Sequence, residues 1–226
     1  MLRAMAQRLD HPVCDLLDKR INTYYVQDNF PDSDTDAEIA RVERSFGMTP
    51  RKHFSAVESI VPELRGLAIL DSDGSHKDDS DQGGLRIVHW RRYEAENYIV
   101  TPAALRQFAM RAYGDASRFG RFEPEIDEVL DELVLEFVFQ GDPHDFSTWK
   151  GLDVDAARLL WEARTERLKL STFAEEFFRR LASRVGRPML LRKGELYELV
   201  GFVHPDQMPA EVSQKLDLLD GLLRSG

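Results

Sequence analysis

The stretch RGLAILDSDGSHKDD (residues 65–79) changes within a few residues from an apolar run to an acidic turn. Residues 67–70 are typical of a buried strand, and Asp71 and Asp73 follow them with a glycine directly behind. Side chains alternate faces along a strand, so we expect the two carboxylates to point the same way. Two like charges side by side repel unless a cation lies between them. A divalent cation is one explanation, and a solvated Asp-Gly turn is the other.

The composition indicates an ordinary globular chain. Its 226 residues are enough for one large domain or two small ones. They are 42% apolar and 31% charged, as is usual for a globular protein. No apolar run approaches the length of a membrane span, and residues 1–12 lack the apolar core of a secretory signal. A single cysteine, Cys14, excludes an internal disulfide and favours a reduced compartment. We therefore expect a cytoplasmic protein with no membrane partner.

The formal net charge of −10 also restricts the function. Phosphate contacts need Lys and Arg, so a net-acidic chain is a poor non-specific coat for nucleic acid. A metal-dependent nuclease is not excluded, because bound cations and local basic patches oppose the global charge.

Hydrophobic periodicity divides the chain into two halves. The first half predicts strands at 22–27, 67–72 and 84–90, alternating with helices that include 2–10, 35–47, 53–64 and 102–113. This alternation is typical of a parallel α/β sheet. The second half predicts long helices at 124–140 and 153–184 and a short strand near 188–193 that returns to the sheet. We expect an α/β domain over residues 1–114 and a mainly helical region over 115–226.

Two further segments carry residues suited to phosphate chemistry. In HWRRYEAENYIV (89–100), Glu94 and Glu96 would share a face if the segment were extended. The alternative there is a salt-bridged edge, in which the two arginines pair with the glutamates. In LLRKGEL (190–196), Lys193 could stabilise charge on a scissile phosphate, or it could be an ordinary surface lysine.

Together these segments resemble a known family. LAILDSDG (67–74) resembles the aspartate motif of Toprim domains. WRRYEAENYIV (90–100) is similar to the Arg-Arg…Glu-Asn-Tyr signature that follows that motif in OLD-type (overcoming lysogenization defect) nucleases. The resemblance is clear over residues 1–110 and looser beyond. It implies a Toprim-like, Rossmann-like parallel sheet flanked by helices, in a protein where Toprim is fused to or paired with an ABC-type ATPase.

The resemblance also implies residue roles. Asp71 and Asp73 would hold Mg²⁺ or Mn²⁺ at the carboxyl end of a strand, and Glu96 would be the third acidic ligand. Glu94 is the second choice for that acidic residue and, with Lys193, a catalytic candidate. The implied reaction is phosphodiester hydrolysis of DNA by a metal-dependent endonuclease, in nucleic-acid processing or phage defence.

Two departures from the family pattern shape the expectation. Toprim domains carry a glutamate at the end of a first strand, and this chain begins at the helix that follows such a strand. The chain also has no G-x-x-x-x-G-K-[ST] motif, so it lacks a P-loop. We expect the C-terminal portion of an OLD-like ATPase–nuclease, with an exposed sheet edge that favours self-association or an ATPase partner, and weak or no cleavage alone.

Two other functions remain open from the sequence. The first is a non-catalytic Toprim-like module that docks on an ABC-type ATPase, with a vestigial acidic pair. The second is a metal-dependent nucleotide-sugar transferase, because an Asp-x-Asp after an apolar strand also binds the cation of a diphosphate. The transferase leaves RRYEAENY (91–98) unexplained and ranks last.

Overall fold

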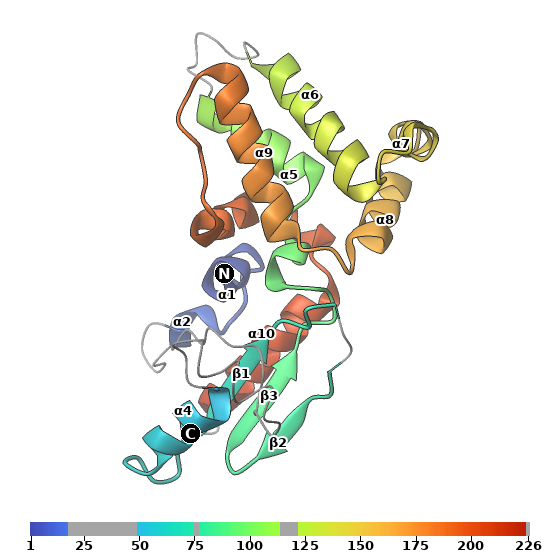
Figure 1. Cartoon of the computed structure of the whole chain (residues 1–226). Coiled ribbons are helices and arrows are strands. Elements are labelled where there is room, and N and C mark those ends of the chain that lie inside the picture. Colours follow the sequence, from blue (N-terminus) through green and yellow to red (C-terminus); the bar gives the residue numbers. More distant parts are fainter. Residues whose placement is uncertain (18–48, 75–76, 114–121, 225–226) are drawn as a thin grey trace, which may run out of the picture.

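The computed structural model describes residues 1–17, 49–74, 77–113 and 122–224, which form a mostly helical α/β structure with one small sheet (Figure 1). The expected strand at 22–27 and helix at 35–47 lie outside these residues. The described helices are α1 (Leu2–Arg8), α2 (Cys14–Leu17), α4 (Pro50–Glu58), η1 (Ala95–Tyr98), α5 (Pro102–Tyr113), α6 (Glu123–Leu133), η2 (Val134–Val138), α7 (Pro143–Lys150), α8 (Val154–Thr165), α9 (Leu170–Val185), η3 (Lys193–Phe202), η4 (Pro205–Gln207) and α10 (Ala210–Arg224). None of them is long and apolar enough to cross a bilayer.

The sheet is mixed and has the strand order β1-β3-β2. Strands β1 (Gly66–Leu70) and β3 (Leu85–His89) pair in parallel, as expected. Strand β2 (Ser80–Gln82) pairs antiparallel with β3, so the sheet is not purely parallel as the sequence predicted. A hairpin forms there because Gly83 and Gly84 both adopt positive φ, as a two-residue type I′ turn requires.

The two faces of the sheet contact different parts of the molecule. On one face Leu70, Leu85 and Ile87 pack against Phe54 of α4 in a small separate cluster. On the other face α10 runs behind β1 (Figure 1), and Ile69 packs against the main core. The carboxyl end of β1 therefore lies where the sheet meets the helical part of the molecule.

The main core joins segments from the whole described chain. Helices α5, α6 and α9 pack beside one another (Figure 1) and bury aromatic side chains such as Phe177 and Phe178. The same cluster contains Met5 of α1, Trp90 after β3 and Leu216 of α10. It thus continues on both sides of the boundary expected at residue 114.

The predicted strand near 188–193 is wrong. Residues 186–192 contain no strand, and η3 begins at Lys193. The Glu195 side chain accepts a hydrogen bond from Arg192 N at 2.8 Å, which caps the start of this helix. Leu196, Leu199 and Val200 are buried on one side of it. Their spacing of three and four residues is helical.

Alanine substitutions in the hairpin should separate two effects. Positive φ costs an L residue about 1–2 kcal/mol, and both glycines have it, at 58° for Gly83 and 85° for Gly84. A Cβ on Gly84 would also lie 2.8 Å from Leu64 O, whereas a Cβ on Gly83 would meet nothing within 4 Å. By calorimetry we expect Gly83→Ala to lower Tm by about 2–8 °C and Gly84→Ala to lower it further. Equal decreases would contradict the close approach at Gly84.

Candidate functional site

The acidic turn after β1 is fastened to the segment after β3. Asp71 is half-buried, and its Oδ1 accepts a hydrogen bond from Ala95 N at 3.2 Å. Asp73 is exposed with a φ of 51°, and its backbone N–H donates to Tyr93 O at 3.1 Å. The strand ends at Leu70, so the alternation of side chains does not extend to Asp73. Backbone contacts with residues 93–95, rather than a continued strand, hold the two aspartates.

A lysine from the same loop lies against this turn. The Lys77 ammonium donates to the backbone oxygen of Asp71 at 3.3 Å and lies 3.5 Å from Asp73 Oδ2. Its charge compensates part of the negative charge of the two aspartates.

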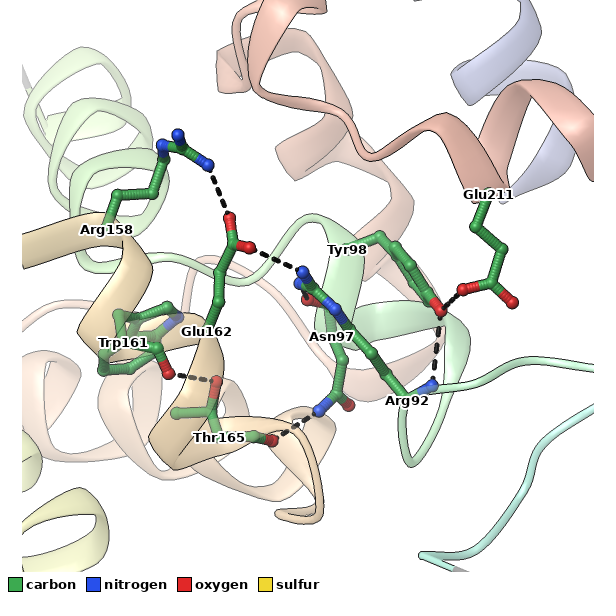
Figure 2. A network of polar contacts seen from close by, with 8 residues as sticks. All are labelled: Arg92, Asn97, Tyr98, Arg158, Trp161, Glu162, Thr165 and Glu211. Carbon is green, nitrogen blue, oxygen red and sulfur yellow. Dashed lines mark hydrogen bonds and ion pairs between the residues drawn. The ribbon is translucent and has the colours of Figure 1, made fainter. Parts of the chain in front are cut away.

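The motif RRYEAENY (91–98) holds the linker between α8 and α9 (Figure 2). Arg92 Nη2 donates to Glu162 Oε2 at 2.8 Å, and Arg92 Nη1 donates to Asn97 O at 2.9 Å. The buried Asn97 Nδ2 donates to Thr165 O at 2.8 Å and to Leu168 O at 3.0 Å. Arg92 thus pairs with α8 instead of with Glu94 or Glu96, so the salt-bridged edge predicted from the sequence takes a different form.

The same motif also contacts α10. The Tyr98 hydroxyl donates to Glu211 Oε2, and Arg91 N donates to Glu211 Oε1 at 2.9 Å. The Arg92 guanidinium lies 4.9 Å from the centre of the Tyr98 ring (Figure 2), and burial raises the pKa of this tyrosine. The motif therefore connects α8 and α10 to the end of the sheet through Arg91, Arg92, Asn97 and Tyr98.

Glu94 is an anchor rather than an exposed acid. Its side chain is buried, with 3% of the residue exposed. Oε1 accepts a hydrogen bond from Ser171 N at 2.5 Å, and Oε2 accepts one from Ser171 Oγ at 3.0 Å. These bonds satisfy a backbone donor in the first turn of α9. A carboxylate at this end of the helix also interacts favourably with the positive end of the helix dipole. Glu96 lies in η1, so the two glutamates do not form the extended pair that the sequence predicted.

Two carboxyl groups of the site have strongly shifted pKa values. The pKa of Asp71 is raised to about 6, mainly by burial and to a smaller extent by the charges of Glu94 and Asp73, while the hydrogen bond from Ala95 N lowers it. Burial also raises the pKa of Glu96 to about 7, with added contributions from Glu94 and Asp71. The charge of Glu94 therefore acts on both groups.

Two lysines act on these carboxyl groups. Lys193, at the start of η3, is exposed, and its charge lowers the pKa of Glu96. Lys169, in the linker before α9, likewise lowers the pKa of Asp71. Sequence reasoning missed Lys169 because it belongs to no motif and lies between two ordinary amphipathic helices.

The side chains are not gathered into a closed cage of metal ligands. Within the four described ranges, no three His, Cys, Asp or Glu side chains converge closely enough to hold a metal ion. The donor chemistry nevertheless fits a hard cation, because Asp71, Asp73 and Glu96 offer carboxylate oxygens. The arrangement is a group of acidic side chains at the end of β1, with positively charged lysine side chains nearby.

Comparisons with known proteins add no assignment to this geometry. No family model matches the chain, and neither a curated protein nor a solved structure matches it. The functional argument therefore depends on the residues and contacts described above.

The raised pKa of Glu96 gives a testable dependence of stability on pH. Its pKa of about 7 in the folded chain exceeds the ordinary value of 4.5. The folded state therefore binds this proton more tightly than the unfolded state does. The stability contributed by the protonated group is complete below pH 4.5 and is lost as the pH rises through 7. With chelator present, we expect Glu96→Gln to raise Tm at pH 8 by a few degrees and to change it little at pH 4.5.

The exposed Glu175 of α9 offers the matched control. Glu175→Gln should leave the difference in Tm between pH 4.5 and pH 8 as it is in the unmodified chain. A Glu96→Gln variant with no gain at pH 8, or with the same gain at both pH values, would show that Glu96 is not held in an unfavourable charged state.

Proposed function

We propose that the chain is the metal-dependent nuclease module of an OLD-like ATPase–Toprim system and hydrolyses phosphodiester bonds in DNA. The hydrogen bond from Ala95 N to Asp71 Oδ1 carries this proposal, because it joins two acidic motifs that are 24 residues apart in the chain. The junction lies at the carboxyl end of β1, and open α/β sheets bind ligands at such ends. The parallel pairing of β1 and β3 supports a Toprim-like sheet.

The proposed metal ligands are three carboxylates that do not converge on one point among the described residues, so they would have to move together when the ion binds. Asp71, Asp73 and Glu96 offer the oxygen ligands that Mg²⁺ and Mn²⁺ prefer. A divalent cation would also relieve the like-charge repulsion that contributes to the raised pKa values of Asp71 and Glu96. When bound, such an ion stabilises negative charge on a phosphate and lowers the pKa of a coordinated water.

Other residues of the chain would orient the DNA and support the site. Lys193 is exposed, its charge acts on Glu96, and it would stabilise the negative charge of the phosphate. Arg167 and Lys169 are exposed in the linker that the motif holds, and they offer contacts to the strand despite the net charge of −10. Glu94 and Asn97 would act by positioning this linker.

A second candidate function is a non-catalytic module that docks on an ABC-type ATPase or on another copy of the chain. Two observations favour it. No three acidic side chains of the described residues converge as metal ligands. No strand among the described residues pairs with the outer edge of β1, and an open edge can accept a strand from a partner. In both cases the proposed setting is nucleic-acid processing or phage defence in the cytoplasm.

Substitution of Asp71 should separate the two functions. Asp71→Asn keeps an oxygen that can accept the hydrogen bond from Ala95 N but removes the charge that binds the cation. We expect affinity for Mn²⁺, measured by calorimetry, to fall by at least about tenfold, and plasmid nicking to fall by about a hundredfold or more. Asp81→Asn, at an exposed position on β2, serves as the control and should change neither quantity.

The outcomes distinguish the candidates. Unchanged Mn²⁺ affinity and unchanged nicking in Asp71→Asn would refute the metal site. Absence of both Mn²⁺ binding and nicking in the unmodified chain would favour the docking module.

A further inference from the structure

An apolar pocket lies between η2, which follows α6, and the segment that leads into the first turn of α9. Its volume is about 230 Å³. Phe137 lies at its wall with 36% of the residue exposed, and its ring meets the buried Phe173 ring edge-on, with 6.0 Å between the ring centres. The lining residues are Phe137, Val138, Leu168, Lys169, Leu170, Thr172 and Phe173.

The wall that carries Phe137 has an unusual backbone. Residues Val134–Val138 form a π-helical turn, η2, that follows α6 directly. The N–H of Phe139 donates to Val134 O, five residues back, at 3.1 Å. Such turns are rare in soluble proteins and occur frequently at functional sites. The turn changes the register of the side chains that follow α6, among them Phe137.

A short segment, 168–171, contributes to the pocket and also contacts the motif that carries Glu94 and Glu96. Leu168 lines the pocket, and its backbone oxygen accepts a hydrogen bond from Asn97. Ser171 binds the buried Glu94. Lys169 lines the pocket, and its charge also acts on Asp71. A ligand that occupied the pocket could therefore extend over Lys169 toward the acidic site.

The chemistry of the pocket selects a flat apolar group attached to an anion. Its volume of about 230 Å³ is below the range of about 300–1,000 Å³ for drug-sized ligands, so a single ring system fits better than a whole nucleotide. Aromatic side chains stack on bases of any sequence, while exposed cations such as Arg167 and Lys169 attract the phosphate backbone.

We propose that this pocket binds an unpaired nucleobase of the DNA strand whose phosphate lies at the carboxylates. The inference rests on the nuclease function proposed above and specifies its substrate class as single-stranded or locally unwound DNA. A base stacked inside a duplex cannot enter a side pocket unless it leaves the stack.

Binding of oligonucleotides without metal tests the pocket separately from cleavage. The full chain is titrated, with chelator present, with a fluorescently labelled 12-nucleotide oligo(dT) and with an abasic strand of the same length. Repulsion between phosphates and carboxylates is the same for both strands, so their affinity ratio reports the base alone. We expect oligo(dT) to bind about tenfold more tightly, as is typical when a base stacks on an aromatic ring. It should also change tryptophan emission, because the Trp161 and Phe173 ring centres are 5.6 Å apart.

Variants test whether the pocket causes the preference for the strand with bases. Phe137→Ala should bring the affinity ratio close to one, and Phe137→Tyr, which keeps the ring, should preserve it. Thr172→Trp fills the pocket from an exposed position on α9 without removing a core side chain, and it should also abolish the preference. Val154→Ala, at a 78% exposed apolar residue on α8, is the control and should behave like the unmodified chain.

Each result has a defined meaning. Equal affinity for the two strands, no binding of either strand, or a preference that survives both Phe137→Ala and Thr172→Trp would overturn the base pocket. A docked apolar side chain of a partner protein would then be the better occupant. Base preference in a chain that neither binds Mn²⁺ nor cleaves DNA would support the pocket and refute the nuclease. Cleavage that requires Asp71 but occurs without base preference would support the nuclease and refute the pocket.

Discussion

The buried carboxylate of Glu94, bonded to the N–H and hydroxyl of Ser171, is the contact on which the rest of the site depends. A buried charge is costly unless it is fully hydrogen-bonded, so this pair tolerates little displacement. It fixes the first turn of α9 against the segment after β3. The same segment, 168–171, contacts Glu94 and Asn97 and also supplies Leu168, Lys169 and Leu170 to the lining of the apolar pocket.

The site combines firm positioning with unfavourable electrostatics. Arg92 and Asn97 hold the linker between α8 and α9 through direct hydrogen bonds. Asp71 and Glu96 are meanwhile held partly out of water near other acids, which disfavours their charged forms. Local destabilisation that the surrounding structure maintains is characteristic of functional sites. A divalent cation between these carboxylates is the simplest compensation in this account.

The sequence predicted what depended on short-range patterns. The parallel pairing of β1 and β3 could be inferred from the alternation of strands and helices in the first half of the chain. The hydrogen bond from Ala95 N to Asp71 joins the acidic turn to the motif at 91–98. The strand predicted near 188–193 was wrong, because the apolar residues 189–191 pack with the main core without pairing with the described sheet, and a capped helix begins at Lys193. The anchoring role of Glu94 could not be inferred, because its partner Ser171 is 77 residues away and belongs to no motif. Phe137 resembled any core residue of a helix, since a π-helical turn has no clear sequence signal.

Site-resolved titration tests the central claim most directly, namely that Asp71 and Glu96 form a cation site held in an unfavourable charged state. The side-chain carboxyl carbons can be followed by NMR against pH, first with chelator and then with saturating Mg²⁺. The account predicts pKa values of about 6 for Asp71 and about 7 for Glu96 without metal, and lower values for both with Mg²⁺. Ordinary pKa values without metal, or raised values that Mg²⁺ leaves unchanged, would contradict it.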